Sequence, residues 1–199
     1  MDFPIYKCII EETVDSDVEV DFVALVDKPA IEKNFLAFNE EKLKFNIDDK
    51  RRIISGPAMI ANMLIYRNVE PLGEYYTFFD KETIEQIAMK FAKKGYMQNL
   101  NLMHDENQKT NGGAVIFESF LTDSSRGILP MKGFEDVADG SWFISAKIED
   151  DSVWEKVTNG TLKGFSVEGI FKQIPVKQQK VTAETLLERM IKLMELYEG

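Results

Sequence analysis

The sequence predicts a mainly β fold with flanking helices (α+β), arranged as a mostly antiparallel barrel or a strongly bent sheet. Short segments rich in β-branched or alternating apolar residues recur along the chain, for example at 18–26 and 141–148. The regular strand–helix alternation that marks a doubly wound parallel sheet does not occur. Hydrophobic residues make up 44% of the 199 residues, which is enough for a packed core.

The N-terminal third predicts strands joined by turns. Residues 18–26 form an apolar strand that ends at a turn containing Pro29. Residues 39–50 are highly charged and indicate a surface connection. A short strand at 51–54 is expected to stop at Ser55-Gly56-Pro57, and a further aromatic strand is expected at 75–79.

The pattern that follows predicts an amphipathic helix over Lys81–Lys93. Asp80 is suited to cap its first turn, and Gly95 is suited to end it. Apolar residues recur at helical spacing on one face, at Ile84, Ile87, Ala88 and Phe91. The opposite face is expected to carry polar residues, namely Glu82, Glu85, Lys90 and Lys93.

The second half of the chain returns to strands, expected at 99–104, 114–121, 141–148 and 162–171. The segment 105–113 is polar and predicts a loop, across which 114–121 hairpins back onto 99–104. A short helix is expected after Asp151 or Ser152, with Val153, Trp154 and Val157 on its apolar face. Two regions result: a domain at 1–175, and a linker with a C-terminal amphipathic helix at 176–199. The apolar stripe of that helix either packs on the domain or pairs with another chain.

Composition and charge exclude several classes of function. The formal net charge of −10 disfavours binding to nucleic acid, and no stretch approaches the length of a membrane span. The first residues lack the features of a signal peptide, so we expect a cytoplasmic protein. One cysteine and one histidine cannot form a zinc site of His and Cys ligands, and phosphate-binding glycine motifs do not occur. We therefore expect no cofactor and no metal.

Two segments contain residues suited to nucleophilic catalysis. His104 follows a predicted strand and could act as a general base, because the pKa of a free imidazole lies near neutrality. Ser166 lies between Gly164 and Gly169, which would let a substrate backbone approach closely. For each residue taken alone, an ordinary structural role is the favoured interpretation.

The order of several motifs resembles the XkdF-like phage serine proteases, relatives of the tailed-phage prohead proteases. The motifs lie at 54–60, 75–84, 99–105, 115–120, 140–143, 153–157 and 164–169, and the resemblance covers about 18–171. It implies the bent antiparallel barrel of the herpesvirus protease assemblin. It also implies that His104 is the catalytic base and Ser166 the nucleophile.

The third catalytic residue is less well defined by the resemblance. In these relatives it lies on a strand after the serine, and no such string follows Ser166. A similar string occurs at 21–30, which suggests a circular permutation that brings Asp21 to the site, provided that a β-bulge corrects its register. Glu118, on the strand predicted to follow His104, is the rival candidate.

The resemblance implies a capsid-maturation (prohead) serine protease that cleaves peptide bonds of the scaffold and of the major capsid protein. It further implies a homodimer that acts in the host cytoplasm, inside the procapsid. The alternative is a non-enzymatic capsid-assembly or scaffolding component that retains the protease fold.

Overall fold

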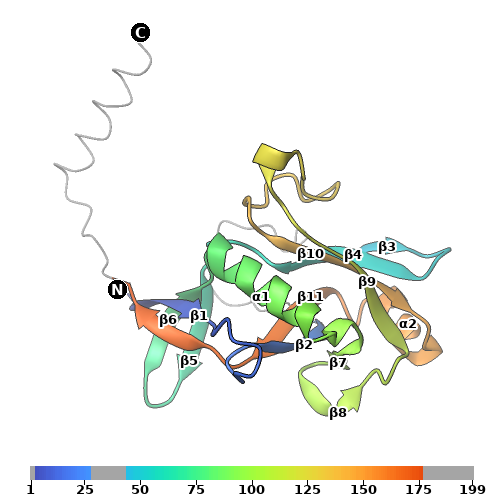
Figure 1. The fold of residues 1–199 in the computed structure, drawn as a ribbon. Helices are drawn as coiled ribbons and strands as arrows, with labels where there is room; N and C mark the ends of the chain where they lie inside the picture. The colour runs from blue at the N-terminus through green and yellow to red at the C-terminus, as the bar shows by residue number, and fades with distance from the viewer. Residues whose placement is uncertain (1–2, 28–43, 177–199) are drawn as a thin grey trace, which may run out of the picture.

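The computed structural model describes residues 3–27 and 44–176, which form three four-stranded sheets and two α-helices (Figure 1). The predicted mainly β fold with flanking helices is therefore confirmed. None of the three sheets closes into a barrel, because in each of them the two outer strands pair on one side only. The predicted linker and C-terminal helix lie outside the described residues, apart from Val176.

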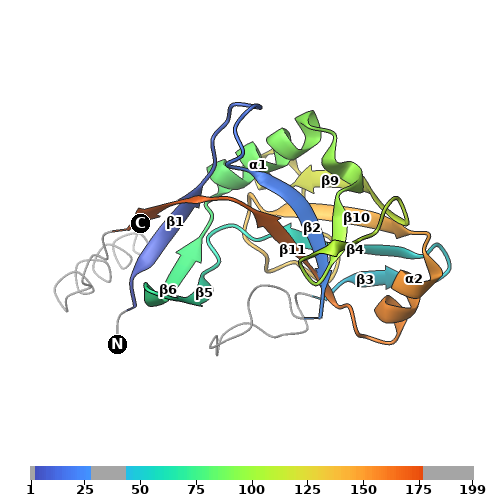
Figure 2. The same cartoon turned by 90° about the horizontal axis from the view of Figure 1, so that it is seen from below.

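The first sheet lies at the end of the molecule where the described chain begins (Figure 2). Its strands, in spatial order, are β12 (Lys172–Pro175), β1 (Ile5–Ile9), β6 (Gly73–Phe78) and β5 (Ile65–Val69). The pairing of β1 with β6 is parallel and the other two are antiparallel.

The second sheet is antiparallel throughout. It contains β3 (Asn46–Asp48), β4 (Ile53–Met59), β10 (Trp142–Ile148) and β9 (Ala114–Leu121), in that order. Every residue of β10 except Lys147 is buried, so this strand is covered on both faces. The predicted break in β4 at Ser55-Gly56-Pro57 is wrong. Because β3 pairs only with residues 53–55, Pro57 lies beyond it and a proline can be accommodated there.

The third sheet places β2 at its centre, between β11 and β7 (Figure 2). Its order is β11 (Gly164–Gly169), β2 (Val20–Val26), β7 (Leu100–Leu102) and β8 (Asp105–Lys109). β2 pairs antiparallel with β11 and parallel with β7. The predicted polar loop after His104 therefore begins with a strand, and β9 pairs with β10 instead of with β7.

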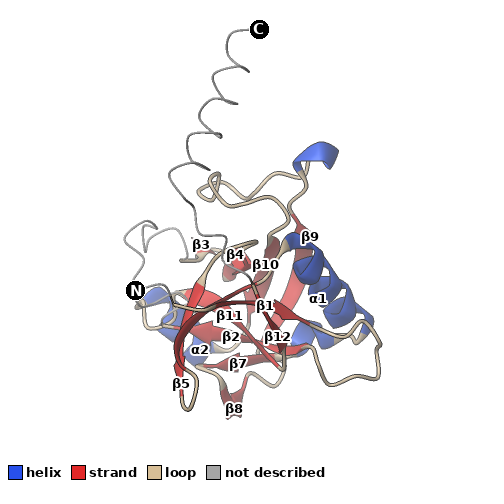
Figure 3. Ribbon diagram, turned by 90° about the vertical axis from the view of Figure 1, so that its left-hand side faces the viewer, coloured by secondary structure: helices blue, strands red, loops and turns tan. Residues whose placement is uncertain are grey.

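The two helices lie on opposite sides of the strands (Figure 3). They are α1 (Lys81–Lys93) and α2 (Asp151–Thr158), with two short 3₁₀ turns at Tyr96–Gln98 and Ser124–Arg126. As predicted, the Asp80 side chain accepts a hydrogen bond from the backbone N–H of Thr83 and caps α1. Phe91 packs against Trp142 in the core, with ring centroids 5.3 Å apart. No helix within the described ranges is long and apolar enough to cross a membrane.

One of the residues predicted for the polar face of α1 is buried. The side chain of Lys90 is only 3% exposed and forms an ion pair of 3.1 Å with the buried carboxylate of Glu19. Lys94 and the Tyr96 hydroxyl also donate to Glu19. Burial alone would raise the pKa of the Glu19 carboxyl, but hydrogen bonds from Lys94, Lys90 and Tyr96 outweigh burial and lower this pKa.

We expect Lys90→Met to lower the free energy of unfolding by about 3 kcal/mol, because it leaves the buried Glu19 carboxylate short of a partner. For a chain of this size the midpoint of thermal unfolding should fall by roughly 6–12 °C. The stabilisation of wild type by Glu19 is present above pH ~4.5 and is lost as the pH falls through its lowered pKa. In thermal melts recorded from pH 7 to pH 3, the unfolding midpoints of wild type and Lys90→Met should therefore converge at acid pH. Lys93→Met, at an exposed position of the same helix, should leave the midpoint unchanged.

Candidate active site

The third sheet aligns three side chains across its strands, on the face that points away from the main hydrophobic core, although all three are themselves buried. Ser166 on β11 lies opposite Ala24 on β2, and Ala24 lies opposite Asn101 on β7. Side chains that face each other across neighbouring strands point to the same side of a sheet. The alternate residues, such as Leu25 and Phe165, belong to the hydrophobic core. The outer face is therefore where the polar side chains of these strands meet.

His104 lies at the tip of the hairpin that joins β7 to β8. Leu102 and Asp105 pair across this hairpin, and Met103 and His104 both have a φ of +57°. Two consecutive positive φ angles in a two-residue loop define a type I′ turn, which normally prefers Asn-Gly. The left-handed conformation costs a non-glycine residue about 1 kcal/mol. The hydrogen bond from the backbone N–H of Met103 to the carbonyl of Leu25 holds this turn against β2.

The turn brings the imidazole of His104 to the side chains of β11. His104 Nε2 lies 3.0 Å from Ser166 Oγ, and His104 Nδ1 lies 3.4 Å from Glu168 Oε2. Glu168 follows Ser166 by two residues on β11, so both side chains are on the outer face. Ser166 is only 4% exposed, whereas the side chain of His104 is 41% exposed. The serine hydroxyl is therefore held in place while the imidazole remains accessible.

This arrangement assigns a tautomer to the imidazole. When Nδ1 carries the proton, it donates to the Glu168 carboxylate, and the lone pair of Nε2 accepts the proton of Ser166 Oγ–H. The predicted proximity of His104 and Ser166 is thus confirmed, while their catalytic roles remain predictions. The neighbouring Asp105 does not compete for His104, because its carboxylate accepts hydrogen bonds from Asn107 and Gln108.

Neither carboxylate proposed from the sequence forms a hydrogen bond or ion pair with His104 in the described part of the chain. A register shift does occur at Asp21, since Glu168 lies opposite Phe22 and Gly169 opposite Val20. The predicted bulge is therefore present. Asp21 is partly buried, and burial, together with the negative charge of Glu168, raises the pKa of its carboxyl group.

Glu118 lies on a different sheet from His104. It is an exposed residue of β9 and faces Ser145 of β10. Even the expected hairpin of β9 with β7 would leave Glu118 about 13 Å from His104 along the strand, and β9 pairs with β10 instead.

The carboxylate that approaches His104 is that of Glu168. It is not among the predicted candidates, because both of these lie on other strands than Ser166. The signal was present in the spacing. On a β-strand a residue two positions after Ser166 shares its face, which makes Glu168 a candidate. What the sequence could not show is that the tip of the β7–β8 hairpin folds over that face.

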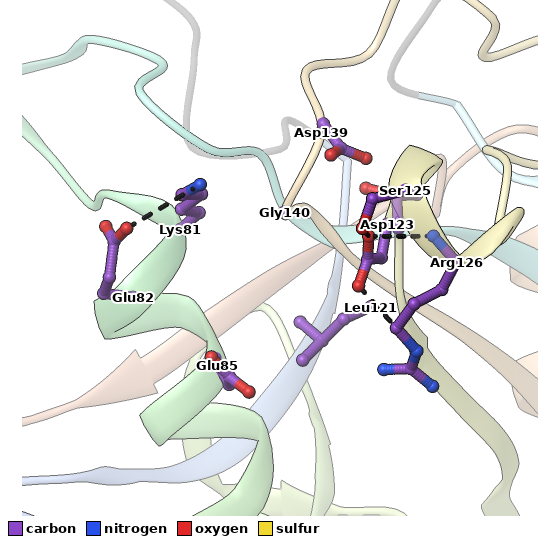
Figure 4. A pocket seen from close by; sticks show the side chains of 10 residues that line it. Lys81, Glu82, Glu85, Leu121, Asp123, Ser125, Arg126, Asp139 and Gly140 are labelled. Atoms are coloured by element: carbon purple, nitrogen blue, oxygen red, sulfur yellow. Dashed lines mark hydrogen bonds and ion pairs between the residues drawn. The ribbon is translucent and has the colours of Figure 1, made fainter.

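A separate hollow of about 420 Å³ lies beside the start of α1 (Figure 4). None of its lining residues belongs to β7, β11 or the turn that carries His104. Two of its carboxylates already serve the local structure: Asp123 accepts from the backbone of Arg126, and Asp139 accepts from that of Ser124. We therefore assign no function to this hollow.

A serine, a histidine and a carboxylate linked in this order form the constellation of the serine hydrolases. The family model described as "Putative phage serine protease XkdF" matches residues 48–175, and the chain belongs to that family. All three linked residues lie within the matched segment, whereas Asp21 lies before it.

Two further comparisons give less information. The chain is 25% identical over 175 residues to the uncharacterized protein YqbD of Bacillus subtilis (strain 168). The aligned segment covers 87% of this chain and 51% of that protein. The chain thus spans about half the length of this relative. No solved structure matches the chain.

Proposed function

We propose that this protein is a serine endopeptidase of phage capsid maturation, which cleaves the scaffold and the major capsid protein. The observation that carries the proposal is the contact chain from Ser166 through His104 to Glu168, found within the segment that matches a phage serine protease family. Ser166 is the nucleophile, His104 the general base and Glu168 the residue that orients the imidazole.

The reaction follows from these contacts. Ser166 Oγ attacks the carbonyl carbon of the scissile peptide bond as its proton passes to His104 Nε2. The imidazolium that forms is stabilised by the Glu168 carboxylate at Nδ1. Cleavage of the C–N bond then transfers the proton from Nε2 to the leaving amine and produces an acyl-enzyme. Water, deprotonated by the neutral imidazole, releases the acid and restores Ser166.

An extended peptide could reach Ser166 along β11, which is an outer strand of its sheet. The backbone groups of Val23 and Leu25 form hydrogen bonds toward β7. Those of Ala24, between them, therefore point the other way, toward Ser166 on β11. By alternation, the backbone N–H and C=O of Val167 point to the other side of β11. β4 runs close to β11, and Phe45 packs against Phe165, so a substrate strand would have to enter between β11 and β4 to present its carbonyl beside the serine.

The relationship to the assemblin-type proteases is also part of this proposal. β2 lies directly beside β11, as expected if it replaces a strand that follows the serine in those proteins. The chain order of His104 before Ser166 agrees with that relationship. A closed barrel is not needed for it, because the contact chain uses only β11 and the β7–β8 hairpin.

We further propose that the enzyme acts as a homodimer or concentrated with scaffold and capsid protein inside the procapsid, in the host cytoplasm. A protease that cleaves the scaffold must stay inactive until assembly. A coupling of about 3 kcal/mol between assembly and order at the site would suppress activity in the free protein roughly 150-fold.

Labelling with a fluorophosphonate, which reacts with activated serines, tests this function. We expect the label on Ser166 in particles assembled from this protein, its scaffold and its capsid protein, and roughly 150-fold slower labelling of the isolated protein. Peptide mapping by mass spectrometry locates the label, and Ser166→Ala provides the control. If Ser166 stays unlabelled in well-formed particles, the protease proposal is wrong and the scaffolding alternative is favoured.

A further inference from the structure

We infer that Asn101 is a positioning residue of this site, which holds the carboxylate of Glu168 against the imidazole of His104. The inference rests on the proposed function and extends it by a fourth residue. Asn101 Nδ2 donates a hydrogen bond of 2.8 Å to Glu168 Oε2. The same oxygen lies 3.4 Å from His104 Nδ1. Asn101 therefore fixes the carboxylate oxygen that faces the histidine.

The sheet explains how Asn101 reaches Glu168. β7 and β11 lie on either side of β2, which places them roughly 10 Å apart. Between Asn101 and Ser166 stands Ala24, whose methyl group leaves room above the central strand. The side chains of Asn101 and Glu168 bridge this gap and meet. His104 follows Asn101 by three residues, so one short segment supplies both partners of the carboxylate.

Because Asn101 is buried, structural stability alone is a weak reason for an asparagine at this position. Asn101 is fully buried, and its Oδ1 has no hydrogen-bond partner within the described residues. An unpaired buried amide oxygen costs about 1–3 kcal/mol. A leucine of similar shape would avoid that cost and fit the interior. The feature that an asparagine adds at this position is the N–H group directed at Glu168.

Replacement of Asn101 by leucine should separate stability from activity. We expect the unfolding temperature of Asn101→Leu to stay close to that of wild type, since removal of the unpaired Oδ1 offsets the lost hydrogen bond to Glu168. Its rate of fluorophosphonate labelling in assembled particles should fall roughly 10–100-fold, because the carboxylate is no longer held in place. Labelling at the wild-type rate by a folded Asn101→Leu would overturn the inference.

The variant Asn101→Asp provides a pH signature that a structural role would not produce. The charged groups around this position are Glu168 on β11, Asp21 on β2, His104 in the turn, and Lys109 on β8, which lies opposite Asn101. At neutral pH the new carboxylate repels Glu168, whereas a proton shared between the two restores a hydrogen bond. The labelling rate relative to wild type should therefore rise as the pH falls from 8 to 5. A ratio that is independent of pH would contradict the inference.

A matched control and a spectroscopic measurement complete the test. Asn99 also donates through Nδ2, at 2.9 Å to the backbone carbonyl of Asp21, so Asn99→Leu should affect stability but not the labelling rate. His104 is the only histidine, so its ¹⁵N resonances are unambiguous. We expect the Nδ1–H tautomer to dominate in wild type and a mixture of tautomers in Asn101→Leu.

The tautomer measurement needs no activity, so it distinguishes the two proposals. If wild type is never labelled, yet Asn101→Leu shifts the tautomer, the protease function fails and the positioning by Asn101 stands. If wild type is labelled and Asn101→Leu changes neither rate nor tautomer, only the inference about Asn101 fails.

Discussion

Replacement of Ser166 by alanine should abolish processing of the scaffold and capsid protein when all three proteins are produced together. Loss of the nucleophile of a serine protease lowers kcat by about 10⁶-fold, far below what gel analysis of particles detects. Assembly should be unaffected, because the Ser166 hydroxyl contacts only His104 among the side-chain partners described. Electrophoresis of purified particles, with uncleaved precursors as the readout, makes the measurement.

The companion variant for the base is His104→Asn. Asparagine tolerates the left-handed conformation that the turn requires, so the β7–β8 hairpin should keep its shape. Processing should be lost as completely as in Ser166→Ala, because the two residues act as one unit. Normal processing in either variant would show that a different residue carries the nucleophile or the base.

Replacement of Glu168 by glutamine should have the second-largest effect, a fall in the processing rate of about 10⁴-fold. A neutral amide can hold the wrong tautomer of the imidazole and cannot stabilise its charged form. The change is isosteric, so the fold is preserved, and the amide oxygen of the glutamine can still accept the hydrogen bond from Asn101 Nδ2. Rates from time courses of precursor cleavage, compared with wild type at equal particle concentration, provide the measurement.

The two carboxylates proposed from the sequence are the matched controls for Glu168. Glu118→Gln should process at the wild-type rate, because Glu118 is on another sheet. Asp21→Asn should change the rate by no more than about tenfold, because it only removes a negative charge near Glu168. A larger loss in Asp21→Asn than in Glu168→Gln would instead make Asp21 the third member and leave Glu168 a neighbour.

The roles proposed for Glu168 and Asn101 give a reason why the histidine lies in a strained turn. If His104 stood on β7 itself, its imidazole would lie over the central strand β2 and would not extend to β11. The two-residue turn with positive φ angles folds His104 back over the outer face of the sheet, where Ser166 and Glu168 are aligned. The strain of roughly 1 kcal/mol per residue is small beside the gain in orientation that the proposed catalysis would require.

Local patterns in the sequence determined several elements correctly. The bounds of α1 follow from the capping aspartate, the helical spacing of Ile84, Ile87 and Phe91, and the glycine after its end. The strands β2 and β10 follow from their β-branched and apolar residues. Such signals lie within a few residues of each other and depend on backbone propensity and capping, which act locally. The pair of His104 and Ser166 came from motif order, and its geometry agrees.

Only the tertiary structure decided which strands pair and which polar groups are buried. The sequence around β8 is polar because β8 is an exposed outer strand, so its hairpin with β7 was hidden and β9 was assigned the wrong neighbour. Lys90 has the spacing of a surface residue, yet Glu19, 71 positions away, stabilises its burial. Glu168 joins the site for the same reason: its partner His104 is brought over β11 by long-range pairing through β2. Contacts between distant segments depend on the free energy of the whole fold, which no local window of sequence contains.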